Sequence, residues 1–457
     1  MTAALTNMVV NAAVHPAVNP AQHVAARETA ELLVLGAGPA GLAAAEAASA
    51  HGLQVTLIDE NFEPGGQIWR GGPSQWRDRS AHVLWRALRG RPGFRFIGGA
   101  RLVACVAPNV VLLETPEGAR QLAWQRMVLC SGARELLLPF PGWTLPGVSG
   151  AGGLQAMIKG GMPVAGQRVV VGGSGPLLLA VADTARRHGA QVLAIAEHQP
   201  TRALARFGAA LALRHPAKLA QALRLRAALA GVPYLSGAVV TQAHGAERLR
   251  AVTLRQGTRE RRIECDLFAC GFGLVPNTEL ASLLGCAIAA GRVQVDAQQR
   301  SSRADVWAAG EAGGIGGVGQ ALAQGRMAGL AAAGHVFTAR ERRQLGKALT
   351  EARAFGTLLA GSFAPLPALR EICRPSTLVC RCEDVSAAQL AVHADWRSAK
   401  LHTRAGMGPC QGRVCASACE FLFGWQAPLA VRQPIFPTSA ATLAGAAPVA
   451  GADSAKG

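Results

Sequence analysis

The sequence lacks the features that mark several classes of protein. It has no block of five or more like charges, although 46 Lys and Arg against 28 acidic residues give a formal charge of +18. No basic stripe, RNP-like motif or helix-turn-helix signature accompanies this charge, so a nucleic-acid partner is not expected. Dispersed arginine of this kind is typical of solvated helix faces. Its other expected use is to bind anionic cofactors or an acidic partner subunit.

Targeting and membrane-spanning segments are also missing. Residues 1–29 have no basic stretch followed by an unbroken apolar core, and we expect a disordered leader instead of a signal peptide. The longest uncharged run beyond it, 136–158, contains three prolines and five glycines, so no membrane span is expected. Eleven cysteines, seven of them isolated, fit a reducing compartment. We expect a cytoplasmic protein, with membrane association only peripherally through a complex.

The first motif predicts a nucleotide site. Residues 31–60, ELLVLGAGPAGLAAAEAASAHGLQVTLIDE, are typical of a strand, a glycine-rich turn, a helix and a second strand. Gly36 suits the tight turn, Gly38 a close approach of the pyrophosphate, and Gly41 close packing of helix on strand. The helix N-terminus then faces the phosphates. Asp59 ends the second strand 18 residues after Gly41, where a carboxylate can bind a ribose.

Three later segments favour FAD as this nucleotide. They are 64–70, which follows Asp59 closely, 127–135, and 295–314, which closes a strand with Gly310 and Glu311. A chain that encloses an extended FAD returns to it several times, because the flavin lies far from the adenine. The sequence therefore predicts an α/β flavoprotein with two dinucleotide-binding domains, one inserted into the other.

A second unit repeats this plan at 167–198. Gly173 and Gly175 occupy the turn and Glu197 ends the second strand. Leu178 replaces the third glycine, which is expected to hold the helix away from the strand. Glu197 favours a free ribose hydroxyl, so we interpret the unit as a site for NAD or an adenine nucleotide. A purely structural repeat is the alternative.

Four cysteines near the C-terminus predict a metal centre. Cys380 and Cys382 form a C-x-C pair, and Cys410 and Cys415 follow after 27 residues with four residues between them. Four thiolates, two on each iron, are the ligands of a [2Fe–2S] cluster. A structural zinc site is the alternative, although its cysteines usually come in C-x2-C pairs. A disulfide framework does not suit a reducing compartment.

The residues around these cysteines suit a cluster. Cationic neighbours favour thiolate and offset the negative charge of a ligated cluster, and glycines let a loop fold around sulfur. Cys373 and Cys419 lie close by and are interpreted as packing thiols. The flanking residues are Arg381, Arg404 and Arg413, with Gly406, Gly408, Pro409 and Gly412 in the loop.

The flavin segments resemble those of thioredoxin-reductase-like FAD oxidoreductases. The resemblance implies that Gly66 and Gln67 approach the isoalloxazine and that Gly132 lies against the nucleotide. It also implies that Glu311 lies by the ribityl chain and pyrophosphate, where many relatives have Asp. A capped turn is the alternative role of Gln67.

The redox cysteine pair of such disulfide reductases is missing. Before residue 380, only Cys265 and Cys270 have a suitable spacing. They lie in an apolar run that we expect to return, as a strand, to the first sheet. Reduction of thioredoxin or glutathione therefore has no evident relay.

Longer segments beyond these motifs also carry information. They are DENFEPGGQIWR, PFPGWTLPGVSGAGGLQAMIKGG, GGSGPLLLAVA, ACGFGLVPNTELASLLGC, AAGEAGGIGGVGQALAQGRMAGLAAAG and VCRCEDV with KLHTRAGMGPCQGRVC. Together they resemble one family closely: the FAD and [2Fe–2S] subunit of opine oxidases, hydrogen cyanide synthase, and hydroxyproline and proline dehydrogenase complexes. The resemblance covers about residues 30–425. Its last part also resembles bacterioferritin-associated-ferredoxin-like domains, whose second pair is often C-x2-C.

This family resemblance implies a division of labour. A flavin-containing partner subunit resembling glycine or D-amino-acid oxidases oxidises a CH–NH or CH–NH2 donor, and a further expected partner is a small ferredoxin-like protein. The present chain relays electrons between flavin and cluster. Hydroxyproline, D-proline, opines and glycine stay open as substrates. A stand-alone NAD(P)H-dependent FAD oxidoreductase and an iron–sulfur binding module are the alternatives.

No catalytic residue is assigned from the sequence. Neither a general base nor a carboxylate-binding arginine pair is evident. Lys159 is either a functional basic group or a helix end that is solvated or contacts an anion.

The expected domains follow these motifs. The arginine-rich stretch 202–230 is expected to be helical. We expect a leader at 1–29, an FAD domain at 30–150 and 263–335, an inserted NAD-like domain at 151–262, a helical linker at 336–369, a small helical [2Fe–2S] domain at 370–425 and a flexible tail at 426–457.

Overall fold

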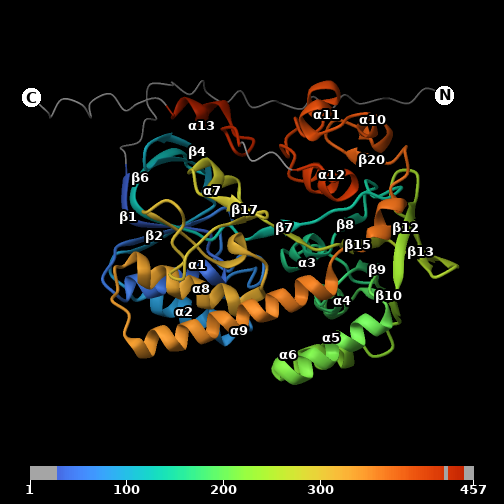
Figure 1. Ribbon diagram of the computed structural model, residues 1–457, viewed down its shortest axis with the longest axis horizontal. Helices are drawn as coiled ribbons and strands as arrows, with labels where there is room; N and C mark the ends of the chain where they lie inside the picture. The colour runs from blue at the N-terminus through green and yellow to red at the C-terminus, as the bar shows by residue number, and fades with distance from the viewer. Residues whose placement is uncertain (1–27, 427–430, 447–457) are drawn as a thin grey trace, which may run out of the picture.

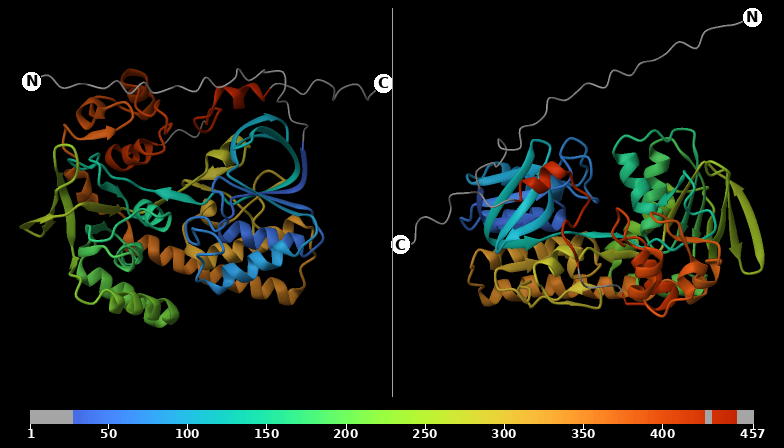
Figure 2. Two further views of the ribbon diagram at one scale, coloured as in Figure 1. Left: turned by 180° about the vertical axis from the view of Figure 1, so that it is seen from behind. Right: turned by 90° about the horizontal axis from the view of Figure 1, so that it is seen from above.

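The computed structural model describes residues 28–426 and 431–446. The predicted leader lies outside the described residues, except that Glu28 and Thr29 already belong to the first strand. Two β-sheets with their own helices lie side by side, and a small C-terminal unit lies against them (Figure 1). Figure 2 shows the same arrangement from behind and from above. The predicted α/β fold with two nucleotide-type domains is confirmed.

The first sheet is built around the first nucleotide motif. Its strand order is β3–β2–β1–β6–β5–β4, with β19 paired to β6. Strands β3, β2, β1, β6 and β19 run parallel, whereas β5 and β4 form an antiparallel edge. The strands are β1 (Glu28–Leu35), β2 (Val55–Asp59), β3 (Phe94–Gly98), β4 (Arg101–Ala107), β5 (Val110–Thr115), β6 (Gly118–Leu129) and β19 (Val306–Ala308).

Two small-residue helices pack closely on this sheet. A Cβ on Gly325 of α8 would stand 2.1 Å from the Ala40 carbonyl oxygen of α1, and a Cβ on Gly329 would stand 2.2 Å from that of Ala44. Only glycine lets the two helices come this close. Helix α8 therefore fixes the position of α1 on the sheet. The helices of this layer are α1 (Pro39–Ser49), α2 (Arg79–Arg89) and α8 (Gly317–Ala332).

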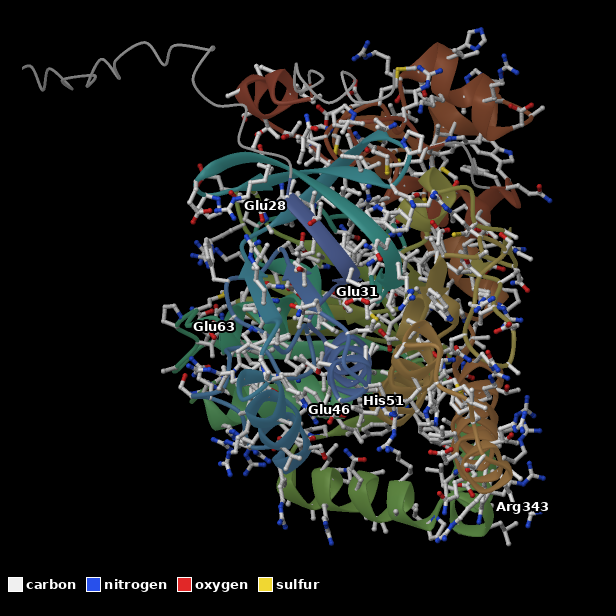
Figure 3. All side chains as sticks on the ribbon, turned by 90° about the vertical axis from the view of Figure 1, so that its left-hand side faces the viewer. Glu28, Glu31, Glu46, His51, Glu63 and Arg343 are labelled. Carbon is white, nitrogen blue, oxygen red and sulfur yellow. The ribbon has the colours of Figure 1, made fainter. Side chains whose placement is uncertain are left out.

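A long helix, α9 (Ala339–Phe363), joins the two halves of the molecule. It begins with a capping box, in which the Thr338 hydroxyl accepts from the Glu341 N–H and the Glu341 carboxylate accepts from the Thr338 N–H. It then runs past the first helix layer and ends near α4 and α5 (Figure 1). Figure 3 shows Arg343 projecting outward from α9, and His51 beyond the end of α1 beside α8.

The second sheet contains the repeated motif, and its composition corrects one prediction. All its pairs are parallel, in the order β11–β10–β9–β15–β8. The prediction that the apolar run after Cys265 returns to the first sheet is wrong, because β15 pairs with β9 and β8 instead. A strand buried on both faces suits either parallel sheet. The strands are β8 (Val148–Gly150), β9 (Arg168–Gly173), β10 (Gln191–Glu197), β11 (Tyr234–Ser236) and β15 (Leu267–Gly271).

Helices and small sheets complete the second domain and its junction with the first. The predicted helix in 202–230 is confirmed as the pair α5 and α6. No helix within 28–426 or 431–446 has both the length and the apolar character that crossing a membrane requires. The remaining elements are α3 (Ala151–Lys159), α4 (Leu177–Arg187), α5 (Thr201–Arg214), α6 (Pro216–Ala228), the antiparallel sheet β12 (Ala238–His244), β13 (Ala251–Gln256) and β14 (Arg259–Glu264), the ribbon β7 (Ala133–Glu135) and β16 (Leu274–Pro276), α7 (Glu279–Leu283), β17 (Ile288–Ala289), β18 (Arg292–Val293) and η2 (Gly310–Gly313).

The C-terminal unit is small and mostly helical. Its core gathers Val379, Leu390 and Trp396 with three cysteines, Cys380, Cys415 and Cys419. The unit consists of η3 (Pro367–Ile372), β20 (Leu378–Cys380), β21 (Val385–Ser386), α10 (Ala387–Ala391), α11 (Trp396–Thr403) and α12 (Cys415–Phe423).

Part of the tail is folded onto the first domain. Ile435 is buried in the core beneath β4–β6, and the Thr438 hydroxyl donates to Glu114 over 2.7 Å. Helix α13 (Ala440–Ala444) follows and lies near β4 and β6 (Figure 1). The expectation of a flexible tail is therefore wrong for 431–446, because these residues bury apolar surface on the first sheet.

Candidate nucleotide and metal sites

The first glycine-rich turn has the geometry of a dinucleotide site. Gly36 has a φ of +96°, and a Cβ there would stand 2.3 Å from the Cys130 carbonyl oxygen. A Cβ on Gly41 would stand 1.7 Å from the Gly36 oxygen, so neither position admits a side chain. Gly38, the residue before α1, has no such neighbour within 3.9 Å. Packing within the protein therefore does not require glycine at position 38, whereas a close approach of a pyrophosphate would.

Asp59 connects the second strand to this turn. Its buried carboxylate accepts from the Ala37 N–H over 2.6 Å, and from the Asn61 N–H and side chain over 2.8 and 2.7 Å. A carboxylate offers about four acceptor positions. Asp59 thus orders the turn and keeps acceptor capacity for a ribose hydroxyl.

The segment after Asp59 folds back over the turn. Gly66 has a φ of +57°, and a Cβ there would stand 2.9 Å from the Cα of Gly38. Gln67 is exposed and accepts a hydrogen bond from Arg70 over 3.0 Å. The Lys159 ammonium, from α3 of the second domain, donates to the Ile68 carbonyl over 3.3 Å. Burial, with the nearby Arg70 charge, lowers the pKa of Lys159. Lys159, the last residue of α3, therefore contacts the predicted flavin segment.

The other two predicted segments reach the same edge of the first sheet. Gly132 follows β6 and Gly310 follows β19, and both have positive φ values. Gly310 donates its N–H to the Oε1 of Gln324 over 2.9 Å. Burial raises the pKa of Glu311. Gln324 is a buried residue of α8 that the sequence did not single out, because no motif marks it.

The second glycine-rich turn is built like the first, but the side chains that contact it are buried inside the domain. A Cβ on Gly173 would stand 1.9 Å from the Gly271 carbonyl oxygen. Leu178 is fully buried, and a Cβ on Gly271 would stand 3.2 Å from its Cδ2. Glu197 is also fully buried and accepts from the Gly175 N–H over 2.8 Å. Burial raises the pKa of Glu197.

The end of α9 lies against the second turn. A Cβ on Gly175 would stand 3.5 Å from the ring of Phe363. That ring packs edge-on against Phe207, with 4.7 Å between centroids. The Gln199 side chain donates to the Ala364 carbonyl over 3.0 Å. Phe363 therefore takes up space beside the glycine that, in a dinucleotide site, admits the pyrophosphate. Sequence reasoning missed this residue, because it lies 188 positions after the turn's last glycine.

The four predicted cysteines lie together in the C-terminal unit. The Cys415 thiol lies within hydrogen-bond reach of both Cys380 and Cys410, and Cys410 also contacts Cys382. Hydrogen bonding to Cys415 holds the pKa of Cys380 at about 6 and that of Cys410 at about 5. The same two contacts raise the pKa of Cys415, because its single S–H proton is shared between the two sulfurs, and burial raises the pKa of Cys382.

Glycines shape the loop around these thiols. A Cβ on Gly408 would stand 2.4 Å from the Cβ of Cys382, and one on Gly406 would stand 2.6 Å from the Trp396 ring. The loop therefore closes tightly over the C-x-C pair. Backbone N–H groups donate to the sulfurs: those of Cys382, Glu383 and Gly406 to Cys380, and those of Gly412 and Val414 to Cys410.

In the part of the chain that the structure describes, no three His, Cys, Asp or Glu side chains are placed to hold a metal ion. Cys373 and Cys419 lie nearby, and burial raises their pKa values to about 11 and about 12. These two behave as the packing thiols that the sequence predicted.

Known proteins are similar to this chain in both sequence and fold. Residues 30–325 match the family model described as pyridine nucleotide-disulphide oxidoreductase. An opine oxidase subunit of Rhizobium meliloti (strain 1021) is 32% identical over 91% of this chain and 98% of its own length. Hydrogen cyanide synthase subunit HcnB of Pseudomonas protegens is 30% identical over 85% of this chain and 90% of its own. The crystal structure of L-proline dehydrogenase from P. horikoshii matches with a TM-score of 0.65 at 18% identity, over 91% of this chain and 80% of that one.

Proposed function

We propose that this chain, which belongs to the pyridine nucleotide-disulphide oxidoreductase family, is an FAD- and [2Fe–2S]-containing electron-transfer subunit. Beyond the region that matches the family, the chain continues into a unit in which four cysteines lie together. Its complex is a heteromeric amino-acid or imino-acid dehydrogenase acting on a CH–NH or CH–NH2 donor. The observation that carries the proposal is the meeting of Cys380, Cys382, Cys410 and Cys415 in one loop-bound cluster.

In this proposal FAD lies along the first turn. Gly36 and Gly41 are fixed as glycine by their own contacts, which leaves Gly38 and the start of α1 for the pyrophosphate. Asp59 holds the adenine-side ribose, and the flavin end follows the segment of Gly66 and Gln67. The remaining contacts that we assign to FAD are Gly132, Gly310 and Glu311.

The cysteines fit a [2Fe–2S] cluster in type, number and surroundings. Four thiolates match two irons with two sulfur ligands each, and backbone amides already point at Cys380 and Cys410. The C-x-C and C-x4-C spacings suit a zinc knuckle poorly. We also propose a reducing, cytoplasmic setting, because seven of the eleven cysteines are isolated in the sequence.

The two groups together suit an electron relay. When bound, FAD exchanges two electrons and the cluster one at a time, so the pair converts hydride chemistry into single-electron flow. The residues of this chain hold and orient the two groups. The relatives that span most of this chain are themselves named as subunits of larger enzymes. We therefore assign substrate oxidation to a partner resembling glycine or D-amino-acid oxidases, and we propose a small ferredoxin-like protein as a further partner.

A stand-alone NAD(P)H-dependent oxidoreductase is the second candidate, and the second turn weighs against it. Phe363 lies beside Gly175, and the Glu197 carboxylate is buried and bonded to that turn. NAD or another adenine nucleotide would need this helix end to move. We therefore place the electron donor on the partner subunit.

The test compares the chain alone with the complex. The chain is purified anaerobically, by itself and with its co-expressed partners, and dye reduction is assayed with hydroxyproline, proline, opines and glycine. We expect activity only in the complex, with FAD and two irons on this chain. Rapid NADH oxidation by the isolated chain would contradict the proposal.

A pair of cysteine variants tests the cluster. Cys410→Ser is expected to remove the iron and the cluster's visible absorption, because it deletes one of four ligands. Cys373→Ser is the matched control and keeps both, since Cys373 is a neighbouring packing thiol. Equal iron content in the two variants would refute the ligand assignment.

A further inference from the structure

A half-buried ion-pair network joins the cysteine loop to the first domain. The Arg134 guanidinium lies 2.8 Å from the Glu279 carboxylate, and its Nε donates to the Arg413 carbonyl over 3.1 Å. The Arg413 guanidinium lies 3.9 Å from the same carboxylate. The three side chains are only 24%, 20% and 16% exposed. Water therefore screens these charges less than it screens surface pairs.

One end of this network lies at the proposed nucleotide edge. Arg134 is two residues from Gly132, on the ribbon strand β7, which crosses between the two sheets below α12 (Figure 1). Asn277 donates its N–H to the Gly132 carbonyl and accepts from Arg134, both over 3.0 Å. The Asn277 side chain also donates to the Ser131 carbonyl over 2.9 Å. Arg134 and the turn at Gly132 are thus held in one hydrogen-bonded unit.

The other end of the network lies at a proposed cluster ligand. Arg413 donates to the Cys410 carbonyl over 3.4 Å, and its guanidinium lies 4.5 Å from the Phe436 ring centroid. It also donates to the Ile435 carbonyl. Its charge interacts favourably with Cys410 and with Glu279. The folded tail therefore holds the Arg413 guanidinium beside the cysteine loop.

Resting on the proposed function, we infer that Arg134, Glu279 and Arg413 are positioning residues that hold the Cys410 loop at the nucleotide edge. We also infer that the Arg413 charge raises the reduction potential of a cluster bound there. Reduction adds a negative charge to the cluster, so a nearby cation favours the reduced form and a nearby anion disfavours it. Glu279 is expected to act in the opposite sense.

The experiment is a potential titration of the anaerobically purified full chain, followed by the electron paramagnetic resonance signal of the reduced cluster. At fixed potential, Arg413→Gln is expected to lower the ratio of reduced to oxidised cluster three- to tenfold, and Glu279→Gln is expected to raise it. A tenfold change in a one-electron couple corresponds to 59 mV. Arg413→Lys should restore most of the ratio, because it keeps the charge.

Arg404→Gln is the matched control. It removes the same charge within the cysteine unit, where Arg404 pairs with Glu383 over 2.9 Å, but the Arg404 side chain is 68% exposed. Its effect is expected to be smaller because water screens it. Equal shifts for the two arginine variants, or shifts of the same sign for Arg413→Gln and Glu279→Gln, would overturn the inference.

Two outcomes separate this inference from the proposed function. A wild-type chain without a cluster overturns both. A wild-type cluster whose potential none of the variants changes overturns the inference alone. Glu279→Gln changes charge with little change in volume, so the sign of its effect decides the question even where Arg413→Gln does not fold.

Discussion

Gly325→Ala is expected to separate α8 from α1 and so weaken both stability and flavin binding. The added Cβ would lie 2.1 Å from the Ala40 carbonyl oxygen, and Cβ atoms do not approach other atoms within 3.0 Å, so the contact must open by about 0.9 Å. Overpacking a core costs about 1–3 kcal/mol, and a clash with backbone belongs at the upper end. The better helix propensity of alanine returns about 1 kcal/mol. The expected net loss is about 2 kcal/mol.

The same displacement reaches the nucleotide turn. Ala40 lies two residues after Gly38, so a shift of α1 moves the N–H groups that we assign to the pyrophosphate. We therefore expect the purified variant to contain less flavin than the wild type. Gly329→Ala clashes one turn further along, with Ala44, and is expected to lose similar stability but less flavin.

Gly346→Ala provides the matched control. Gly346 lies inside α9, and a Cβ there meets nothing within 4 Å. The same substitution is therefore expected to stabilise the chain by about 0.5–1 kcal/mol through helix propensity. Thermal unfolding followed by circular dichroism gives the stabilities, and flavin absorbance per protein gives the occupancy. Equal destabilisation of Gly325→Ala and Gly346→Ala would refute the packing argument. Full stability and flavin content in Gly325→Ala would refute it as well.

Two further predictions test the second domain. Phe363→Ala should gain binding of NADH, measured by isothermal titration calorimetry, because it frees the space at Gly175. Phe355 lies on the same helix and its ring contacts His215, so Phe355→Ala should not gain NADH binding. Equal NADH binding by the wild type and Phe363→Ala would contradict the proposed obstruction by Phe363. His198 is buried without a hydrogen-bond partner, and burial lowers its pKa from 6.5 to about 4. The unfolded chain therefore takes up the proton first, so stability falls by up to about 3 kcal/mol as pH drops from 6.5 to 4. In denaturant titrations over this pH range, His198→Phe should lose less stability than the wild type. His188→Asn, a change at an exposed histidine, should lose as much stability as the wild type. Identical pH curves for the wild type and both variants would contradict the role given to His198.

The sequence predicted those parts of the candidate sites that depend on local spacing. Gly36, Gly38 and Gly41 lie within six residues, and the chemistry of a tight turn before a helix dictates their type. The cysteine spacing likewise indicated that Cys380 and Cys415 would meet. In the glycine turn a short loop leaves the chain few alternatives, whereas for the cysteines the residue type and the spacing within each pair carried the prediction.

Residues that depend on distant partners could not be predicted in this way. Phe363 has no local feature that points to Gly175, and Arg134 and Arg413 meet across 279 positions. The strand β15 was misplaced because burial on both faces does not identify the sheet. Ile435 was missed because one apolar residue in an alanine-rich tail carries no periodicity.

The late strand β19 has a consequence for how the chain is made. Residues 127–129 of β6 pair with Val306–Ala308, which follow 179 positions later. A ribosome adds about 5–20 residues per second, so this strand edge stays open for about 9–36 s during synthesis. During that interval the second domain is being translated, and an open edge is a template for wrong pairing. We therefore expect the nascent chain to depend on chaperones until residue 308 has left the ribosome.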